Sequence, residues 1–265
     1  MTLMSQLSPD TSASVSPAPD PAQIDDLRAR VAALNARYRH HGATSVLAGA
    51  LGDAESGDIA MVSSFGAESV ALLHLVAMID RTTPVLFIDT RLLFAETLAY
   101  QQEVAERLHL RDVRVLRTDD ATLAQSDPMG ALRLTDKNAC CALRKTVPLE
   151  NALQGFDGWI TGRKRFQAST RATLEFFELE EETGRIKVNP LAHWAPEDVR
   201  NYMDENRLPR HPLVEQGYPS IGCMPCTSKV APGEDPRAGR WRGEEKTECG
   251  IHFGNGAPAR TGSDT

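Results

Sequence analysis

Residues 59–69 read Ile-Ala-Met-Val-Ser-Ser-Phe-Gly-Ala-Glu-Ser, and this stretch decides the fold that the sequence predicts. Its apolar part, 59–65, has the length of one buried β-strand, and residues 70–79 follow with the apolar content of a packed helix. The serines and the glycine between them mark the point where the strand turns into the helix. A strand that turns directly into a helix is the repeating unit of α/β sheets.

The same alternation continues on both sides of this stretch. Asp20 and Pro21 have the pattern of a helix start, and an apolar stripe at helical spacing follows them. Strands that alternate with helices of about 10–15 residues indicate βαβ units and a mostly parallel, twisted sheet flanked by helices. The further predicted elements are strands at 85–90, 113–118 and 158–162, helices at 95–108 and 195–205, and a hairpin of 174–180 and 185–188.

Composition narrows the class of protein. The chain has 265 residues, 41% apolar and 25% charged, and no apolar run approaches the ~20 residues that span a bilayer. Residues 1–20 lack the features of a secretory signal and are predicted to form a disordered lead, which favours a cytoplasmic protein without a membrane segment. A net charge of −7 argues against a nucleic-acid partner, although it allows a local cation cluster around a small anion.

The segment between the first predicted strand and helix is a candidate phosphate site. Ligands of open α/β sheets bind at the carboxyl ends of strands, and a helix N-terminus there offers unpaired N–H groups. The alternative is an ordinary strand–helix turn with a serine cap. The candidate residues are Ser63, Ser64, Gly66, Glu68 and Ser69.

Five cysteines in a chain of this kind favour metal or redox chemistry over disulfides. Cys140 and Cys141 are adjacent, and Cys223 and Cys226 form a C-x-x-C, so two close pairs could make one four-cysteine site. An iron–sulfur cluster, a zinc ion, a redox dithiol and inert buried cysteines all remain open. Because structural zinc sites usually separate their ligands, the adjacent pair favours the cluster.

Cys249 is the fifth cysteine, and Lys246 and His252 lie near it in the sequence. Neighbouring cations lower the pKa of a thiol and increase its thiolate fraction, so Cys249 is a candidate nucleophile. An inert cysteine in the tail and a C-x-x-H metal half-site are the alternatives. Cations that could converge on an anion follow predicted strand ends and the cysteines: Arg144, Lys145, Arg163, Lys164, Arg165, Arg171, Arg237, Arg240 and Arg242.

Taken together, these residues resemble the assimilatory reductases of adenylyl sulfate (APS) and its 3′-phosphorylated form (PAPS), in the iron–sulfur branch of that family. The resemblance covers residues 55–252, and the motifs occur in the order that the family has. The matching segments are Cys140-Cys-Ala-Leu-Arg-Lys145 with Pro148-Leu149, Trp159-Ile-Thr-Gly162 leading to Ser169-Thr-Arg171, Asn189-Pro-Leu191 with Trp194, Tyr218-Pro-Ser-Ile-Gly-Cys-Met-Pro-Cys-Thr227, Gly233-Glu-Asp-Pro-Arg-Ala-Gly-Arg-Trp241, and Glu248-Cys-Gly-Ile-His252.

The resemblance implies a fold like that of the adenine nucleotide α-hydrolases, with residues 63–69 as the phosphate (PP) loop. It implies one [4Fe–4S] cluster per chain, and it divides the chain into a domain at 21–235 and a mobile catalytic segment at 236–265. The cluster ligands would be Cys140, Cys141, Cys223 and Cys226.

The implied reaction is reduction of APS to sulfite and AMP by thioredoxin or a glutaredoxin-like protein, through an S-sulfocysteine on Cys249. His252 and Lys145 would assist, with Lys145 linking the cluster to the sulfate. PAPS is the alternative substrate, and a PP-loop ATP pyrophosphatase or a zinc-bound interaction module is the alternative class; assembly into a homo-oligomer is left open. The further substrate-binding residues would be Asp89, Thr90, Arg171, Arg237 and Arg240.

The sequence departs from the family after its second predicted strand. The family usually has Asp-Thr-Gly there, whereas Arg91 follows Asp89 and Thr90 in this chain. The missing glycine leaves the local loop geometry near the nucleotide open.

Overall fold

The computed structural model of the chain describes residues 19–52, 57–167, 171–244 and 251. Its centre is a six-stranded sheet in the order β3-β2-β1-β4-β6-β5. The β3-β2, β2-β1, β1-β4 and β4-β6 pairs are parallel, and only the β6-β5 hairpin is antiparallel. The mostly parallel α/β sheet that the sequence predicts is therefore confirmed.

The elements follow one another as strands and helices along most of the chain. The strands are β1 (Ile59–Ser63), β2 (Val85–Ile88), β3 (Val113–Leu116), β4 (Gly158–Ile160), β5 (Phe177–Glu180) and β6 (Arg185–Val188). The main helices are α1 (Pro21–Tyr38), α2 (Ala43–Gly52), α3 (Ser69–Ile79), α4 (Ala95–Arg107), α8 (Val147–Leu153) and α9 (Pro196–Glu205). Shorter ones are α5 (Asp120–Ser126), α6 (Leu132–Thr135), α7 (Lys137–Cys141) and α10 (Pro212–Glu215), with η2 (Ala142–Thr146), η3 (Arg165–Gln167) and η5 (Met224–Cys226).

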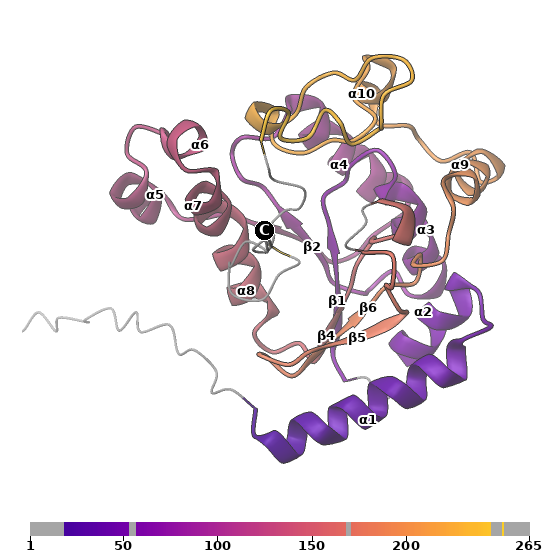
Figure 1. Cartoon of the computed structure of the whole chain (residues 1–265). Coiled ribbons are helices and arrows are strands. Elements are labelled where there is room, and N and C mark those ends of the chain that lie inside the picture. Colours follow the sequence, from indigo (N-terminus) through magenta and orange to yellow (C-terminus); the bar gives the residue numbers. More distant parts are fainter. Residues whose placement is uncertain (1–18, 53–56, 168–170, 245–250, 252–265) are drawn as a thin grey trace, which may run out of the picture.

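Side chains alternate across the central strands and fill two cores. Ile59 and Met61 of β1 belong to the larger core, which includes buried residues of α2, α3, α4 and α9. Ala60 faces the other way and joins a smaller core with Leu149 and Leu153 of α8. This period of two places helices on both faces of the sheet, as Figure 1 shows.

Helix α1 closes the β5 edge of the sheet. Asp20 caps it by accepting a hydrogen bond from the Gln23 amide, as its sequence pattern predicts. The Asn35 side chain donates to the Phe177 carbonyl at 2.8 Å and accepts from the Phe177 amide at 3.0 Å. These two bonds satisfy backbone groups of an edge strand that has no further neighbour in the sheet.

Several element boundaries differ from the predicted ones. The first strand ends at Ser63 rather than at residue 65, because Phe65 adopts a left-handed conformation with φ 47°. Cys140 and Cys141 lie near the start of a continuous helical run made of α7, η2 and α8, which begins at Lys137 because Asp136 caps the amides of Asn138 and Ala139. Helix α2 was not predicted at all.

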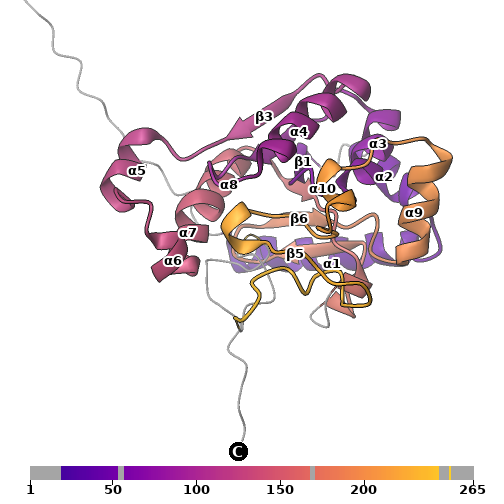
Figure 2. The same ribbon diagram turned by 90° about the horizontal axis from the view of Figure 1, so that it is seen from above.

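The chain after α9 lies across the carboxyl ends of the strands. In Figure 1 this segment lies above the sheet, and Figure 2, from above, shows α5, α6 and α7 together on one side. Within that segment the indole of Trp241 is buried. The domain division at residue 235 stays a prediction. None of the described helices has the length and apolar character needed to cross a membrane.

Candidate active site

A cavity of about 700 Å³ opens at the carboxyl ends of β1, β2 and β4. The strand order reverses on the two sides of β1, and open α/β sheets bind ligands at such a switch point. The volume lies within the roughly 300–1,000 Å³ that is usual for small-molecule sites. Among the described lining residues, eight cations outnumber two carboxylates, although the chain as a whole carries a net charge of −7: Lys145, Arg163, Lys164, Arg171, Arg200, Arg210, Arg237 and Arg240 against Glu68 and Asp235.

The loop after β1 forms one wall of the cavity and is folded by its own serines. The Ser63 hydroxyl accepts from the Phe65 amide at 3.2 Å, and the Ser69 hydroxyl accepts from the Gly66 amide at 3.0 Å. All five predicted phosphate-loop residues line the cavity: Ser63, Ser64, Gly66, Glu68 and Ser69. The hydroxyls of Ser63 and Ser69 thus hold the loop in shape.

The segment after β4 supplies an adjoining part of the cavity wall. The Lys164 ammonium is buried and lies 2.9 Å from a carboxylate oxygen of Glu68 in the β1 loop. Burial lowers the pKa of Lys164; Glu68 opposes this shift, whereas the positive charges of Arg171 and Arg237 add to it. The Gln167 side-chain oxygen accepts from both the Lys164 amide, at 3.2 Å, and Arg171 Nη1, at 2.5 Å. Lys164 and Arg171 are therefore fixed side by side after β4, and Lys164 pairs with a carboxylate of the β1 loop.

The loop after β2 lies between the cavity and the cysteines. Asp89 is turned away from the cavity: its carboxylate accepts from the Arg91 amide at 2.8 Å and from Arg117 Nε at 2.9 Å. The Thr90 hydroxyl lies 3.2 Å from Cys223 Sγ. Arg91 has φ 59°, so this chain keeps a left-handed conformation where the related family has glycine. The loop therefore takes a backbone conformation that favours glycine although no glycine is present.

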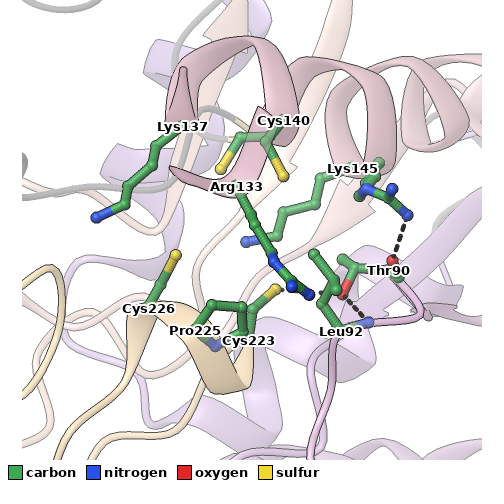
Figure 3. A pocket seen from close by; sticks show the side chains of 11 residues that line it. Thr90, Leu92, Arg133, Lys137, Cys140, Lys145, Cys223, Pro225 and Cys226 are labelled. Atoms are coloured by element: carbon green, nitrogen blue, oxygen red, sulfur yellow. Dashed lines mark hydrogen bonds between the residues drawn. The ribbon is translucent and has the colours of Figure 1, made fainter. Parts of the chain in front are cut away.

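Four cysteines line a small chamber next to the cavity. Cys140 and Cys141 come from the end of α7, and Cys223 and Cys226 flank η5. Figure 3 shows Cys140 and Lys145 on the helical side, facing Cys223 and Cys226 across the chamber. The predicted joining of the two cysteine pairs is therefore seen in the structure.

The surroundings of the chamber are cationic. Its lining includes Arg133, Lys137, Arg144 and Lys145. The pKa of the Cys140 thiol is raised, chiefly by burial; the neighbouring Cys223 and Cys226 add to this shift, and the positive charges of Arg144 and Lys145 oppose it. Four soft sulfur donors inside a ring of cations suit an anionic thiolate-bound group. In the part of the chain that the structure describes, no group of three or more His, Cys, Asp and Glu side chains is arranged to hold a metal ion.

Lys145 lines both the cysteine chamber and the cavity. It lies in η2, a π-helical turn that continues α7 directly after the cysteine pair. Such turns interrupt the regular helical spacing and often occur at functional sites. Arg144, its neighbour, donates instead to the Asp127 carboxylate at 2.8 Å and to the Thr90 carbonyl at 3.2 Å.

The C-terminal cations Arg237 and Arg240 also line the cavity, together with Ile251. Arg165 and Arg242 do not: Arg165 is bonded to Leu174 and Glu175, and Arg242 to Ser228, Lys229 and Glu234. The predicted nucleophile Cys249 and its companion His252 lie outside the described residues.

Sequence reasoning missed two cations of the cavity, Arg200 of α9 and Arg210 before α10. Neither stands in a motif, and both pair with nearby acids, Arg200 with Glu197 at 2.8 Å and Arg210 with Asp204. Nothing in the local sequence separates them from ordinary surface arginines.

The fold and the site define a nucleotide-binding α/β protein in which a cysteine chamber adjoins a cationic cavity. The chain belongs to the phosphoadenosine phosphosulfate reductase domain family, whose family model matches residues 58–229. It is 47% identical to the adenosine 5′-phosphosulfate reductase of Mesorhizobium japonicum over 86% of this chain and 89% of that protein. It is 44% identical to the protein of the same name from a Chelativorans species, over 89% of this chain and 94% of that protein.

Solved structures agree on the fold. The phosphoadenylyl-sulfate reductase of Candida auris matches with a TM-score of 0.64 and 24% identity, over 82% of this chain and all of that chain. The FMN adenylyltransferase of Candida glabrata matches with a TM-score of 0.52 and 14% identity, over 81% of this chain and 78% of that chain. At these identities the likeness concerns the fold alone, and it confirms the PP-loop-like nucleotide-binding fold predicted from the sequence.

Proposed function

We propose that this protein reduces adenylyl sulfate to sulfite and AMP, with Cys249 as the nucleophile. The observation that carries the proposal is that the cationic cavity adjoins the four-cysteine chamber. Thr90, Lys145 and Cys223 line both. The cavity has the size and charge for a nucleotide with a phosphosulfate group. The relatives named as adenosine 5′-phosphosulfate reductases support the same substrate.

The reaction consists of two displacements. The Cys249 thiolate attacks the sulfur of the sulfate group; the bond from that sulfur to the phosphate oxygen breaks, and AMP leaves with the electron pair. The product is an S-sulfocysteine. A thiolate of a thioredoxin-like dithiol then attacks Cys249 Sγ, sulfite leaves with the electron pair, and the second thiol of the reductant releases Cys249. The dithiol is thereby oxidised to a disulfide while the sulfate sulfur is reduced.

The position of Ile251 supports this role for Cys249. Ile251 lines the cavity, and Cys249 precedes it by two residues in the sequence. The described residue nearest to Cys249 in the sequence therefore belongs to the lining of the cavity. We infer that His252, on the other side of Ile251, orients the reacting groups.

Cations on the cavity wall would hold the substrate and stabilise the phosphate as it leaves. Arg171 and Arg240 offer planar guanidinium groups that bind phosphate oxygens in pairs, and Arg237 and Lys145 add positive charge. Interactions of this kind act where charge develops in the transition state.

Cys140, Cys141, Cys223 and Cys226 would hold a [4Fe–4S] cluster. When bound, it would supply a fixed charge and a rigid link between the two cysteine segments. Because the dithiol brings both electrons, no electron needs to pass through it. The cationic lining of the chamber matches the negative charge of a thiolate-bound cluster.

Replacing Lys145 with alanine should keep the iron and lower sulfite release about tenfold or more, because the variant loses one charge-assisted hydrogen bond to the sulfate group. Lys145→Arg is the matched control, since it keeps the charge, and should recover part of the activity. Iron content and initial rates of sulfite release measure the two effects. A Lys145→Ala protein with its iron and full activity would contradict the link.

The test of the whole proposal is anaerobic purification, an iron and sulfide assay, and sulfite release with thioredoxin. Brown protein with about four irons per chain, active on adenylyl sulfate, is the expected result. PAPS in a parallel assay decides between the two sulfonucleotides. Colourless protein that releases no sulfite from either nucleotide would overturn the proposal.

A further inference from the structure

We propose that Gly222 is a positioning residue: its missing side chain leaves the space that the Arg240 guanidinium occupies at the cavity. The segment that carries Cys223 and Cys226 then determines where a substrate-binding cation lies. This inference rests on the proposed function and adds to it a residue whose role is purely spatial.

The close approach of Gly222 and Arg240 is the first observation. A Cβ at Gly222 would lie 2.4 Å from Arg240 Nη2 and 2.6 Å from Cζ. Gly222 does not belong to the glycines with positive φ, so no backbone requirement accounts for it. What this position requires is the absence of a side chain.

The Arg240 guanidinium is also held on its other sides. Nη1 donates to the Ile221 carbonyl at 3.0 Å, and Cζ lies 4.5 Å from the ring centroid of Trp241. A guanidinium between a glycine backbone and an aromatic ring has few alternative rotamers. Arg240 therefore loses little further conformational entropy when an anion binds.

The backbone of the arginine segment is fixed to the cysteine segment as well. Thr227 and Arg240 form an isolated antiparallel bridge, and the Ser228 amide donates to the Gly239 carbonyl at 2.8 Å. The Trp241 amide donates to the Cys226 carbonyl at 3.2 Å. Both the main chain on either side of Arg240 and its side chain are thus hydrogen-bonded to the segment that carries Cys223 and Cys226.

The experiment is a double-mutant cycle on AMP binding, measured by calorimetry on anaerobic protein. Gly222→Ala meets only the end of a flexible side chain, so the protein should fold and keep its iron while the guanidinium is displaced. We expect the dissociation constant for AMP to rise about tenfold, as for the loss of one charge-assisted hydrogen bond. Arg240→Ala should have an effect at least as large, and Gly222→Ala should add nothing in the Arg240→Ala background.

Two further variants serve as controls for the positioning role. Gly42→Ala places a Cβ in open space and should bind AMP like the wild type. Arg240→Lys keeps the charge but loses the planar group, so it should weaken binding, and adding Gly222→Ala should again have no effect. Additive effects of Gly222→Ala and Arg240→Ala, or wild-type affinity in Arg240→Lys, would overturn the positioning role. Wild-type protein that binds no AMP would instead contradict the proposed function.

Discussion

Replacing Cys249 with serine should abolish sulfite release from adenylyl sulfate and leave AMP binding and iron content unchanged. A serine hydroxyl is not ionised at neutral pH, and it cannot form the S-sulfo intermediate or exchange with a dithiol. Removal of a catalytic nucleophile lowers turnover by on the order of 10⁴-fold or more, because the other catalytic residues cannot act without it. Initial rates with thioredoxin measure the loss.

Mass spectrometry of the intact protein separates this result from a folding defect. Wild-type protein mixed with adenylyl sulfate but no reductant should gain one sulfonate group, and the Cys249→Ser protein should gain none. A sulfonate on any other residue, or sulfite release by the serine variant near the wild-type rate, would contradict the role of Cys249.

The second large effect is expected from Cys226→Ala. Loss of one of four thiolates should remove the iron and the brown colour, because the remaining three leave one coordination position open to solvent. AMP affinity should fall as well, because loss of the metal group would loosen the cysteine segment, whose Cys226 carbonyl accepts from the Trp241 amide next to Arg240. Binding of a metal group also contributes to folding, so thermal stability should drop.

Cys249→Ser is the matched control for Cys226→Ala, because both changes should lower turnover but only Cys226→Ala should also lower iron content and AMP binding. The first should lose turnover with iron and AMP binding intact, and the second should lose all three. Iron assay, calorimetry and thermal unfolding on the two anaerobic proteins give the comparison. Full iron content in Cys226→Ala would exclude Cys226 as a ligand.

Periodicity predicts most of the central sheet, because buried parallel strands leave apolar runs that alternate with helices. All six strands were predicted within a few residues. The early end of the first strand has a local cause, because Phe65 leaves the strand through a positive φ. Backbone conformation of this kind is not encoded in hydrophobicity.

The candidate site was predictable where residues stand in motifs and unpredictable where only the fold brings them together. The cysteine pairs and the residues 63–69 belong to the first kind. Arg200 and Arg210 belong to the second, since they reach the cavity only because α9 and the segment before α10 lie over the sheet. Asp89, which was expected to bind substrate, accepts from Arg117 instead and is absent from the described residues that line the cavity.

The two hydrogen bonds between Asn35 and Phe177 affect the tendency of the protein to aggregate at high concentration. An open strand edge is a template on which a second chain can add a strand and begin aggregation. At Phe177 both backbone groups are taken by a side chain from a helix, which cannot propagate a ladder. Asn35 thus prevents a further strand from pairing with Phe177 at the β5 edge, away from the candidate active site.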